Sequence, residues 1–351
     1  MLRGALIGLG NVAIHGHLPG WMARDDVRIV AATDTRPGQR GECAARLPGA
    51  RWYESPEALL DQAALDFVDI CTPPSSHAAL IRAALGRGLH VLCEKPLVGS
   101  LRELGEVSAL AAARGRALHT VHNWHYAPIV RRTGELIAQG AIGRVTGAVW
   151  QTLRTRPAAT ADGRNGNWRV DPHVAGGGVL TDHGWHVHYV LPRWIGAAPT
   201  AVSARLETRR HTAFAVEDTA TLRLIFPGGS AEVFLTWAAD ARGNWAALDG
   251  TAGRIELHDD TVALKAGGGE RRWPCPPALS DGSQHPDWFQ GVADEFVSAV
   301  SRGATAHVNL AEAACCVAIE SLARESSRRG GEVLPLPAAG SALAGFRGSA
   351  P

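Results

Sequence analysis

The chain has 351 residues, of which 46% are hydrophobic and 20% charged, and its formal net charge at pH 7 is +1. This length predicts two domains rather than one. The near-neutral charge gives no basis for binding nucleic acid, a membrane surface or a strongly acidic partner. The first apolar run begins beside Met1, and the six cysteines lack CxxC spacing. We therefore expect a cytoplasmic protein with free thiols, no signal peptide and no membrane span.

The first apolar run, residues 2–8, leads directly into Gly8-Leu9-Gly10-Asn11-Val12-Ala13, and a helix-compatible segment starts at Asn11. In this G-x-G-x-x-A pattern the glycines allow a tight turn and close approach of the backbone to a pyrophosphate. Ala13 lets the helix pack on its strand, and the helix N-terminus offers N–H groups to phosphates. The pattern predicts a dinucleotide site.

A second apolar strand, residues 27–32, is followed by Asp34, about 20 residues past the glycine loop, where a carboxylate holds the ribose hydroxyls. A carboxylate there also repels a 2′-phosphate, which favours NAD(H). Arg36 is positioned to bind such a phosphate and leaves NADP(H) open. The alternative for Asp34 is a turn residue that opens the segment 34–38.

Further strands at residues 66–71 and 90–93 alternate with helical segments, which predicts a parallel, doubly wound α/β sheet. Ligands of such sheets bind beyond the carboxyl ends of the strands, where the loops 72–74 and 94–96 also lie. The candidate cofactor-binding residues are therefore Gly8, Gly10, Asn11, Val12, Asp34, Thr72, Pro73, Glu94 and Lys95.

Lys95 is one of only two lysines among 35 basic side chains. Because this chain otherwise uses arginine for positive charge, a lysine at a strand end indicates that a titratable amine is needed. Arginine stays protonated, whereas a lysine amine can give or take a proton. The alternative is a strand-end lysine paired with Glu94.

After a last strand at residues 117–122 the pattern changes to β-rich runs, with a Pro227-Gly228-Gly229 turn between two of them. This predicts a large open mixed, mostly antiparallel sheet. Helices are expected at 288–301 and 310–326, before an Ala/Gly/Pro-rich tail. The predicted domains are 1–122, a Rossmann dinucleotide-binding domain, then 123–335, a β-sheet domain, and 336–351, a loosely held tail. The β-rich runs are 146–153, 201–208, 219–226, 230–236 and 254–258.

A glycine-rich run, residues 176–178, precedes Asp182, His183, His186 and His188. On a helix, Asp182 and His186 lie on one face, where the carboxylate would fix the imidazole tautomer and raise its basicity. The alternative is a capped helix with a packed histidine. The histidines face different ways on a helix and no HExxH pattern occurs, so we expect no bound metal. His119, His122 and His125 are spaced by three, which also permits a cluster on one face, but they are given no more weight as a metal site.

Several motifs occur together in order, and through them the chain resembles the Gfo/Idh/MocA family of nicotinamide-dependent sugar and cyclitol oxidoreductases. The resemblance covers about residues 2–335. The E-K-P motif combined with the GGG…D…G-x-H run is its most specific part. The matching residues are Gly8 to Ala13, Thr72-Pro73-Pro74 with His77, Glu94-Lys95-Pro96, Asn123 to Pro128, Gly140 and Gly143, Trp168-Arg169, Gly176 to His186, Glu217-Asp218, and Gly250 and Gly253.

The resemblance implies a Rossmann domain, an open sheet domain that binds substrate and mediates assembly to a homodimer or homotetramer, and an active site between them. It implies that Lys95 is the polarising acid/base, Asp182 its carboxylate partner and His186 the proton acceptor. It adds His77 to the cofactor residues. The chain departs from the family where members often carry an arginine after Asn123 and at His183 and Trp185, so specificity cannot be transferred. The candidate substrate-binding residues are Asn123, Trp124, His125, Arg154, Trp168, Arg169 and His183.

The predicted function is hydride transfer between a secondary alcohol of a sugar, sugar derivative or cyclitol and NAD. An excess of arginine in residues 154–170 (Arg154, Arg156, Arg164, Arg169) favours a substrate with a phosphate or carboxylate, unless this is a solvated loop. Trp124, Trp168 and Trp185 suit a sugar ring or, equally, a sheet core. The alternatives are an NAD-dependent glycosidase acting by transient oxidation and elimination, and a non-catalytic dinucleotide-sensing protein.

Overall fold

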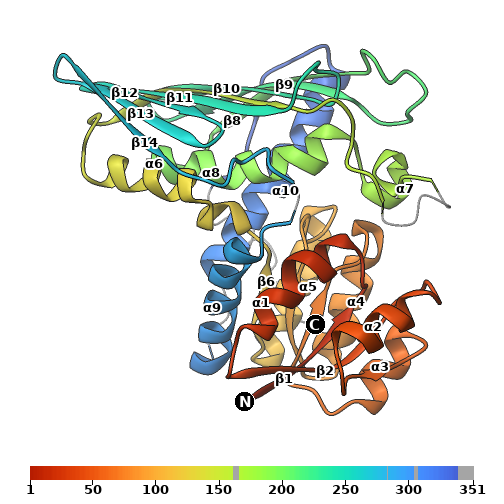
Figure 1. Cartoon of the computed structure of the whole chain (residues 1–351). Coiled ribbons are helices and arrows are strands. Elements are labelled where there is room, and N and C mark those ends of the chain that lie inside the picture. Colours follow the sequence, from red (N-terminus) through yellow and green to blue (C-terminus); the bar gives the residue numbers. More distant parts are fainter. Residues whose placement is uncertain (161–165, 283, 304–306, 339–351) are drawn as a thin grey trace.

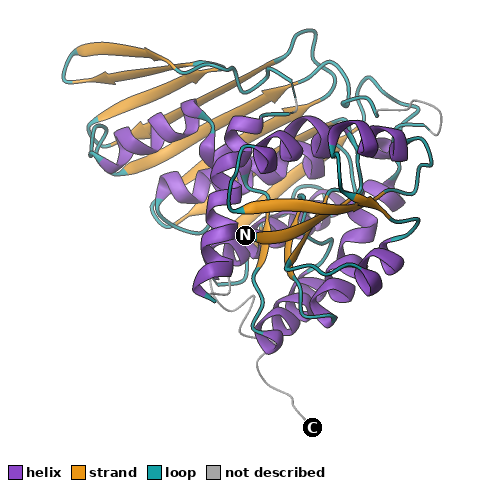
Figure 2. Cartoon of the chain, turned by 60° about the horizontal axis from the view of Figure 1, so that its bottom comes forward, coloured by secondary structure: helices purple, strands orange, loops and turns teal. Residues whose placement is uncertain are grey.

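The computed structural model describes residues 1–160, 166–282, 284–303 and 307–338. Its strands form two separate sheets, and helices fill the space between them (Figures 1 and 2). None of the helices in these ranges is both long enough and apolar enough to cross a bilayer.

The first sheet is parallel throughout, and its strands follow the order β3-β2-β1-β4-β5-β6. This is the order of a Rossmann fold. Successive strands are added on one side of β1 as far as β3, and then on the other side from β4 onward, so the strand order switches between β1 and β4. The crevice at that point receives the loop after β1, which is the glycine loop. The strands are β1 (Leu2–Ile7), β2 (Val27–Thr33), β3 (Arg51–Trp52), β4 (Phe67–Ile70), β5 (His90–Cys93) and β6 (Leu118–Thr120).

Side chains that alternate along β1 enter two different hydrophobic clusters, as the pleat of a strand requires. Ala5 and Ile7 belong to the cluster of α3, α4 and α5, whereas Leu6 belongs to that of α1, α2 and α9. The helix α9 comes from the far end of the chain, yet Phe289 and Phe296 complete the core of the first sheet. A division at residue 122 therefore leaves out one helix that packs on the first sheet. The helices are α1 (Leu18–Met22), α2 (Gln39–Arg46), α3 (Pro56–Gln62), α4 (His77–Gly86), α5 (Leu101–Arg114) and α9 (Pro286–Arg302).

The second sheet has nine strands in the order β14-β13-β12-β11-β7-β10-β9-β8-β15. All its neighbours are antiparallel except β7 and β10. The fold prediction of a Rossmann sheet followed by a mostly antiparallel mixed sheet is confirmed. The strands are β7 (Val145–Leu153), β8 (Ala201–Glu207), β9 (Thr219–Phe226), β10 (Gly229–Thr236), β11 (Gly243–Gly250), β12 (Gly253–His258), β13 (Thr261–Ala266), β14 (Gly269–Pro274) and β15 (Leu334–Pro335).

One face of the second sheet is covered by helices that lie between it and the first sheet (Figure 1). A row of paired residues across five strands shows this face: Leu222, Val233, Trp150, Ala246 and Leu257 are all at most 2% exposed. The covering helices are α6 (Pro128–Ala138), α8 (Trp185–Ile195) and α10 (His307–Arg328).

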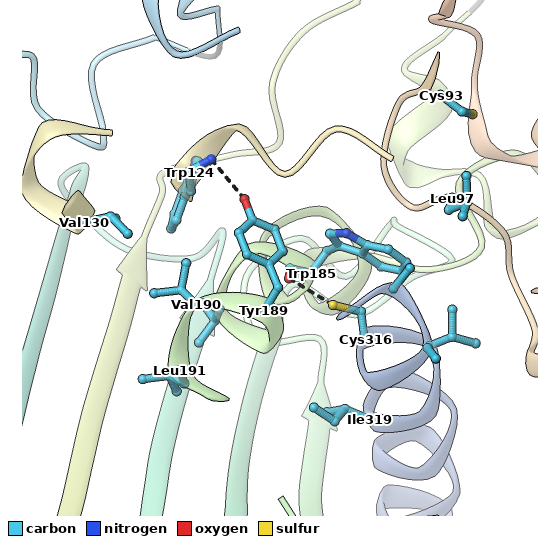
Figure 3. Packing of buried hydrophobic residues seen from close by; sticks show 14 of the residues in the cluster. Cys93, Leu97, Trp124, Val130, Trp185, Tyr189, Val190, Leu191, Cys316 and Ile319 are labelled. Carbon is cyan, nitrogen blue, oxygen red and sulfur yellow. Dashed lines mark hydrogen bonds between the residues drawn. The ribbon is translucent and has the colours of Figure 1, made fainter. Parts of the chain in front are cut away.

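The packing of α8 and α10 against the segment after β6 holds the two halves together (Figure 3). Trp185 is completely buried there, and its backbone carbonyl accepts a hydrogen bond from the Cys316 thiol. Tyr189 of α8 lies below Trp124, whose backbone N–H donates to the tyrosine hydroxyl at 3.0 Å. A continuous apolar core therefore fixes the position of the α8 side chains relative to the first sheet.

Candidate active site

Two adjoining hollows form a crevice between the sheets. The first, of about 470 Å³, is lined by the glycine loop, Asp34, Thr72 and Pro73. The second, of about 530 Å³, is lined by Lys95 from the first domain and by Asp182 and His186 from the second. The structure therefore brings the three predicted catalytic residues into one space beside the predicted cofactor residues. Both hollows share the walls Asn11, Val12, Cys71, Thr72, Ala159, Trp168 and Arg169.

The glycine loop fits a pyrophosphate. Gly8 has φ +91°, and a Cβ there would lie 2.9 Å from the Thr72 side chain and 3.0 Å from the Cys71 backbone. A Cβ on Gly10 would meet no atom within 4 Å, so the backbone there faces open space. A helical stretch follows at residues 11–12 and continues through the π-helical turn η1 (Ala13–His17) into α1. The loop therefore offers exposed backbone at a helix start, as phosphate binding requires.

Asp34 lies at the end of β2, and both of its oxygens are engaged. The Leu9 N–H donates to Oδ2 at 2.7 Å, and the Arg36 guanidinium donates to Oδ1 at 3.0 Å and Oδ2 at 2.9 Å. Burial alone would raise the pKa of Asp34, but these donors hold it below its usual range. The Asp34 carboxylate is thus charged, and Arg36, the side chain that could bind a 2′-phosphate, is hydrogen-bonded to it.

His77 lies behind the crevice and lines neither hollow. Its side chain is completely buried, with Nε2 at 2.8 Å from the Thr72 carbonyl and Nδ1 at 2.8 Å from the Pro96 carbonyl. The resemblance placed His77 among the cofactor-binding residues. In the structure it instead connects the two loops that carry Thr72 and Lys95.

A buried network under Lys95 was not foreseen from the sequence. His17 lies between two carboxylates, with Nδ1 at 2.9 Å from Asp69 and Nε2 at 3.0 Å from Glu94. Burial would lower the pKa of His17, but Asp69 and its other neighbours raise it well above the usual value. The second Glu94 oxygen accepts the Lys95 backbone N–H at 2.9 Å. The His17 imidazolium therefore pairs with Glu94, whereas the Lys95 amine hydrogen-bonds to Asp182.

Lys95 pairs with Asp182 rather than with Glu94. Its Nζ donates to the Asp182 backbone carbonyl at 2.7 Å and to the carboxylate at 3.1 Å. Arg169 Nε and His183 Nε2 lie farther from the same carboxylate, at 3.9 and 3.6 Å. Burial raises the pKa of Asp182, but Lys95 and these neighbours outweigh it and hold the pKa well below its usual range. The predicted lysine–carboxylate partnership is present across the two domains.

The prediction that Asp182 pairs with His186 is wrong. Within the described chain, His186 hydrogen-bonds through Nδ1 to the Tyr189 hydroxyl at 2.9 Å, and no bond to Asp182 is found. The reason is local: residues Leu180–Gly184 form a π-helical turn, η5, which holds an extra residue per turn and shifts side chains four apart out of line. Burial and the nearby Lys95 charge lower the pKa of His186 well below 6.5 instead of raising it.

His186 is nevertheless held rigidly. Its ring stacks on Trp124 with centroids 4.4 Å apart and an interplanar angle of 11°. Trp124 thus contacts the candidate base directly, and its own backbone N–H orients Tyr189. The importance of Tyr189 could not be found from sequence, since a tyrosine in an apolar helix normally indicates only core packing.

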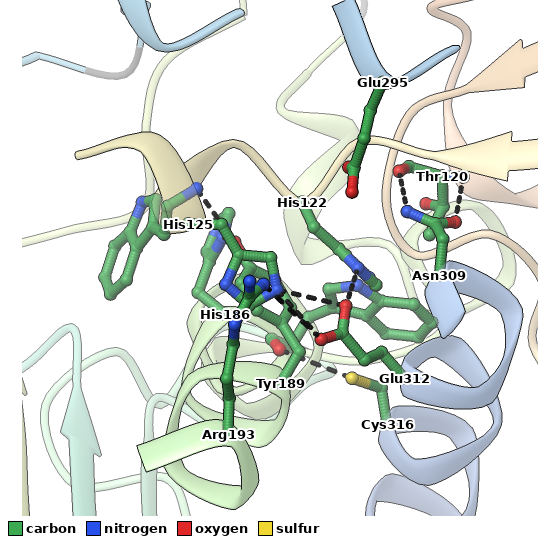
Figure 4. Close-up of polar contacts among 12 residues, drawn as sticks. Thr120, His122, His125, His186, Tyr189, Arg193, Glu295, Asn309, Glu312 and Cys316 are labelled. Carbon is green, nitrogen blue, oxygen red and sulfur yellow. Dashed lines mark hydrogen bonds and ion pairs between the residues drawn. The ribbon is translucent and has the colours of Figure 1, made fainter. Parts of the chain in front are cut away.

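Most predicted substrate residues line the second hollow, namely Asn123, Trp124, Arg154, Trp168, Arg169 and His183. His125 does not. It turns away with His122, and both rings contact Glu312 of α10 at 3.0 Å (Figure 4). His125 lines a separate groove of about 1090 Å³ beside α6, α8 and α9. Trp185 is buried in the core, and Arg164 falls outside the described residues.

Two groups of side chains in the described chain have the spacing that a metal ion would need. One is His17, Asp69 and Cys71, and the other is His122, His125 and Glu312. Each group is already joined by hydrogen bonds within itself, which account for its geometry. The expectation that no metal is bound stays a prediction.

The three glycines before η5 allow close contact between segments. A Cβ on Gly178 would lie 1.9 Å from the Glu217 carbonyl oxygen, and one on Gly177 would meet the Arg324 guanidinium. Glu217 accepts the Gly178 N–H at 3.0 Å and pairs with Arg324. This close contact is made with the segment before β9 and with α10, and it fixes the start of the Asp182 turn.

Comparison with known proteins identifies the two halves separately. Residues 2–122 match the family described as oxidoreductase family, NAD-binding Rossmann fold, and residues 130–256 match the GFO/IDH/MocA C-terminal domain. Among relatives, D-glucoside 3-dehydrogenase of Escherichia coli is 29% identical over 53% of this chain and 52% of its own length. D-apiose dehydrogenase of Paraburkholderia graminis is 30% identical over 66% of this chain and 59% of its own. The matches thus span little more than half of these relatives.

Solved structures share the fold over nearly the whole chain. An oxidoreductase from Agrobacterium radiobacter, in complex with NAD⁺, L-tartaric acid and magnesium, has a TM-score of 0.83 at 21% identity, covering 95% of this chain and 98% of its own. Levoglucosan dehydrogenase in complex with NADH and levoglucosan has a TM-score of 0.83 at 22% identity, covering 96% and 99%. With both domain models matched in order, the chain belongs to the Gfo/Idh/MocA oxidoreductase family and has its NAD-binding Rossmann domain.

Proposed function

We propose that this protein is an NAD-dependent dehydrogenase that transfers hydride between a secondary alcohol of a sugar, sugar derivative or cyclitol and the nicotinamide. The observation that carries the proposal is the meeting of Lys95 with Asp182 and His186 in one hollow that shares its walls with the glycine-loop hollow. A hydroxyl-bearing carbon in that space lies next to an amine, an imidazole and the cofactor site.

Each side chain has a role that its geometry supports. Lys95 spends two hydrogen bonds on Asp182, which leaves its third N–H for the substrate hydroxyl, where it stabilises developing negative charge. His186 takes the hydroxyl proton. When His186 Nδ1 carries a proton it donates to the Tyr189 hydroxyl, so that Nε2 keeps its lone pair for the substrate. Bound NAD⁺ supplies the hydride acceptor.

Asp182 fixes Lys95 and, among the described contacts, makes no hydrogen bond to His186. Its charged carboxylate holds the amine at 3.1 Å, and its backbone carbonyl holds it at 2.7 Å. Trp124 places the imidazole by stacking on it, and Tyr189 fixes its rotation. The proton acceptor and the polarising amine are thus held by different side chains.

The test is a panel of neutral sugars, sugar acids, sugar phosphates, inositols and aminocyclitols, screened with NAD⁺ for NADH absorbance. NADH formation with at least one free polyol supports the proposal. Sugar release from glycosides without net NADH would support a glycosidase instead. Tight NAD binding with no reaction on any substrate would favour a sensing protein.

The cofactor prediction concerns Asp34. We expect the wild-type protein to bind NADH at least about 10-fold more tightly than NADPH, because a 2′-phosphate would lie beside a charged carboxylate whose arginine partner is already engaged. Asp34→Ser should weaken NADH binding and strengthen NADPH binding, since it removes the repulsion and releases Arg36. Quenching of tryptophan fluorescence measures both affinities without a substrate. Equal affinity of the wild type for both cofactors would contradict the assignment.

We expect assembly through the outer face of the second sheet. No described helix covers this face (Figure 1), and paired positions across it carry Phe234, Gln151 and Trp245 side by side. Burial of such a partly apolar face under a second copy of the chain lowers the free energy of the assembly. Light scattering should give the mass of a dimer or tetramer, and Trp245→Glu should shift it towards the monomer. A monomeric wild type at micromolar concentration would contradict this prediction.

A further inference from the structure

We infer that the substrate carries an anionic group, a carboxylate or a phosphate monoester, which Arg154 and Arg242 bind. This inference rests on the proposed function and narrows its substrate class. It starts from the distribution of charge around the crevice. The hollow that contains Lys95 and His186 is also lined by four arginines: Arg154, Arg156, Arg169 and Arg242.

Three of these arginines are separate from the cofactor half. The glycine-loop hollow is lined by Arg36 and Arg169, whereas Arg154, Arg156 and Arg242 line only the second hollow. Arginines that served the pyrophosphate or a 2′-phosphate would lie along the glycine loop and Asp34. The positive charge of Arg154, Arg156 and Arg242 therefore faces the ligand that binds beside Lys95 and His186.

The acidic residues of the second hollow are already used. Its carboxylates are Asp182, which is held by Lys95, and Glu94, which is held by His17. No carboxylate of the described chain lies within ion-pair distance of Arg154 or Arg242, whose hydrogen-bond partners there are backbone carbonyls. Among the described residues that line the substrate hollow, positive side chains therefore outnumber carboxylates.

Arg154 is the decisive residue, because it is only 3% exposed. Its Nη1 donates to the carbonyls of Leu153 at 2.8 Å and Gly243 at 3.1 Å, which leaves its other nitrogens for a ligand. Burial and the Arg242 charge lower its pKa to about 10, and the charges of Asp259 and Asp182 offset this only in part. A buried charge that no carboxylate contacts directly is costly, and a bidentate carboxylate or phosphate is the ligand that best removes the cost.

Arg242 supports the same group from the loop after β10. The residue is exposed at the edge of the hollow, where its guanidinium is held by a hydrogen bond to the Ser280 carbonyl at 2.8 Å. Arg154 follows β7 and Arg242 precedes β11, which are neighbouring strands. Two arginines that approach from adjacent strands form a fork that a neutral hydroxyl could not neutralise.

The test compares matched ligands: D-glucose with D-glucuronate and D-glucose 6-phosphate, and D-galactose with D-galacturonate and D-galactose 6-phosphate. Each is titrated calorimetrically into the NADH-loaded protein, which reports binding without turnover. We expect at least one anionic member to bind about 10-fold or more tightly than its neutral partner, and this advantage to shrink between about 50 and 500 mM salt. Comparison of the uronates with the 6-phosphates shows whether the bound anion is a carboxylate or a phosphate.

Arg154→Met and Arg242→Met should each weaken the anionic ligand by about 10-fold or more and leave the neutral one unchanged. Arg102→Met, at an exposed arginine of α5 far from the crevice, is the matched control and should change neither. If Arg154 only ties the strand ends together, its variant lowers stability and weakens both ligands alike, which overturns the inference.

The outcomes separate this inference from the proposed function. Oxidation of neutral sugars with no anionic preference in any pair overturns the inference and leaves the dehydrogenase proposal intact. Tight, arginine-dependent binding of an anionic sugar without NADH formation from NAD⁺ supports the inference and contradicts the dehydrogenase proposal. The absence of any preferential binding in both series also overturns the inference.

Discussion

Lys95→Arg should lower kcat by about 100-fold or more while leaving NADH affinity unchanged. Removing a group that handles a proton or a developing charge in the transition state typically costs this much. The variant keeps the charge, so a purely electrostatic role would survive it. However, the space around Lys95 Nζ is fixed by the Asp182 carbonyl at 2.7 Å and its carboxylate at 3.1 Å. A longer, planar guanidinium cannot occupy this position and still direct one N–H at the substrate.

The chain itself provides the control, because its only other lysine is remote from the crevice. Lys265 lies on β13 and pairs with Glu256 at 2.7 Å. Lys265→Arg keeps this surface pair and should retain wild-type kcat. Both variants should unfold at temperatures close to that of the wild type, measured by circular dichroism. Near-normal turnover by Lys95→Arg would remove Lys95 from the chemistry, whatever the effect on substrate affinity.

The first sheet was well predicted from the sequence because its parallel strands are buried on both faces. Such strands appear as short continuous apolar runs, and the run 90–93 matches β5 residue for residue. In the second sheet, β9 was likewise predicted with its observed bounds, but β11, β13 and β14 were missed. The sequence of β11, Gly243–Gly250, is rich in alanine and glycine and has no β-branched residue, so only its neighbours β7 and β12 make it a strand.

The pairing of Lys95 with Asp182, 87 residues apart, was predicted only through the family resemblance, because no local pattern joins the two positions. The support of His186 could not be predicted, because it depends on a π-helical turn and on residues from separate segments. A helical wheel placed Asp182 beside His186, and one extra residue per turn undid that alignment. His17 is 77 residues from Glu94 in sequence, and a histidine after a glycine loop carries no signal of such a partner.

The pH dependence of alcohol oxidation should distinguish the observed environment of His186 from the predicted one. A base must be neutral to accept the substrate proton. An ordinary histidine would lose about 10-fold in rate for each pH unit below about 6.5. Burial and the Lys95 charge lower the pKa of His186, so its protonation requires more acidic solution. We therefore expect kcat to stay nearly constant from about pH 8 down to about pH 6, with any loss that His186 causes displaced to lower pH.

Two variants assign this behaviour to His186. His186→Asn should lower kcat by about 100-fold or more, since an amide cannot accept the proton. Tyr189→Phe removes the hydrogen bond to Nδ1 and keeps the ring, so it should lower kcat by about 10-fold through loss of orientation. Because that hydroxyl also stabilises the imidazolium, its removal cannot raise the pKa of His186. A loss of kcat that begins near pH 6.5 in the wild type would contradict this prediction. It would mean that His186 has the pKa of an ordinary histidine in the substrate complex, as a direct contact with Asp182 would give.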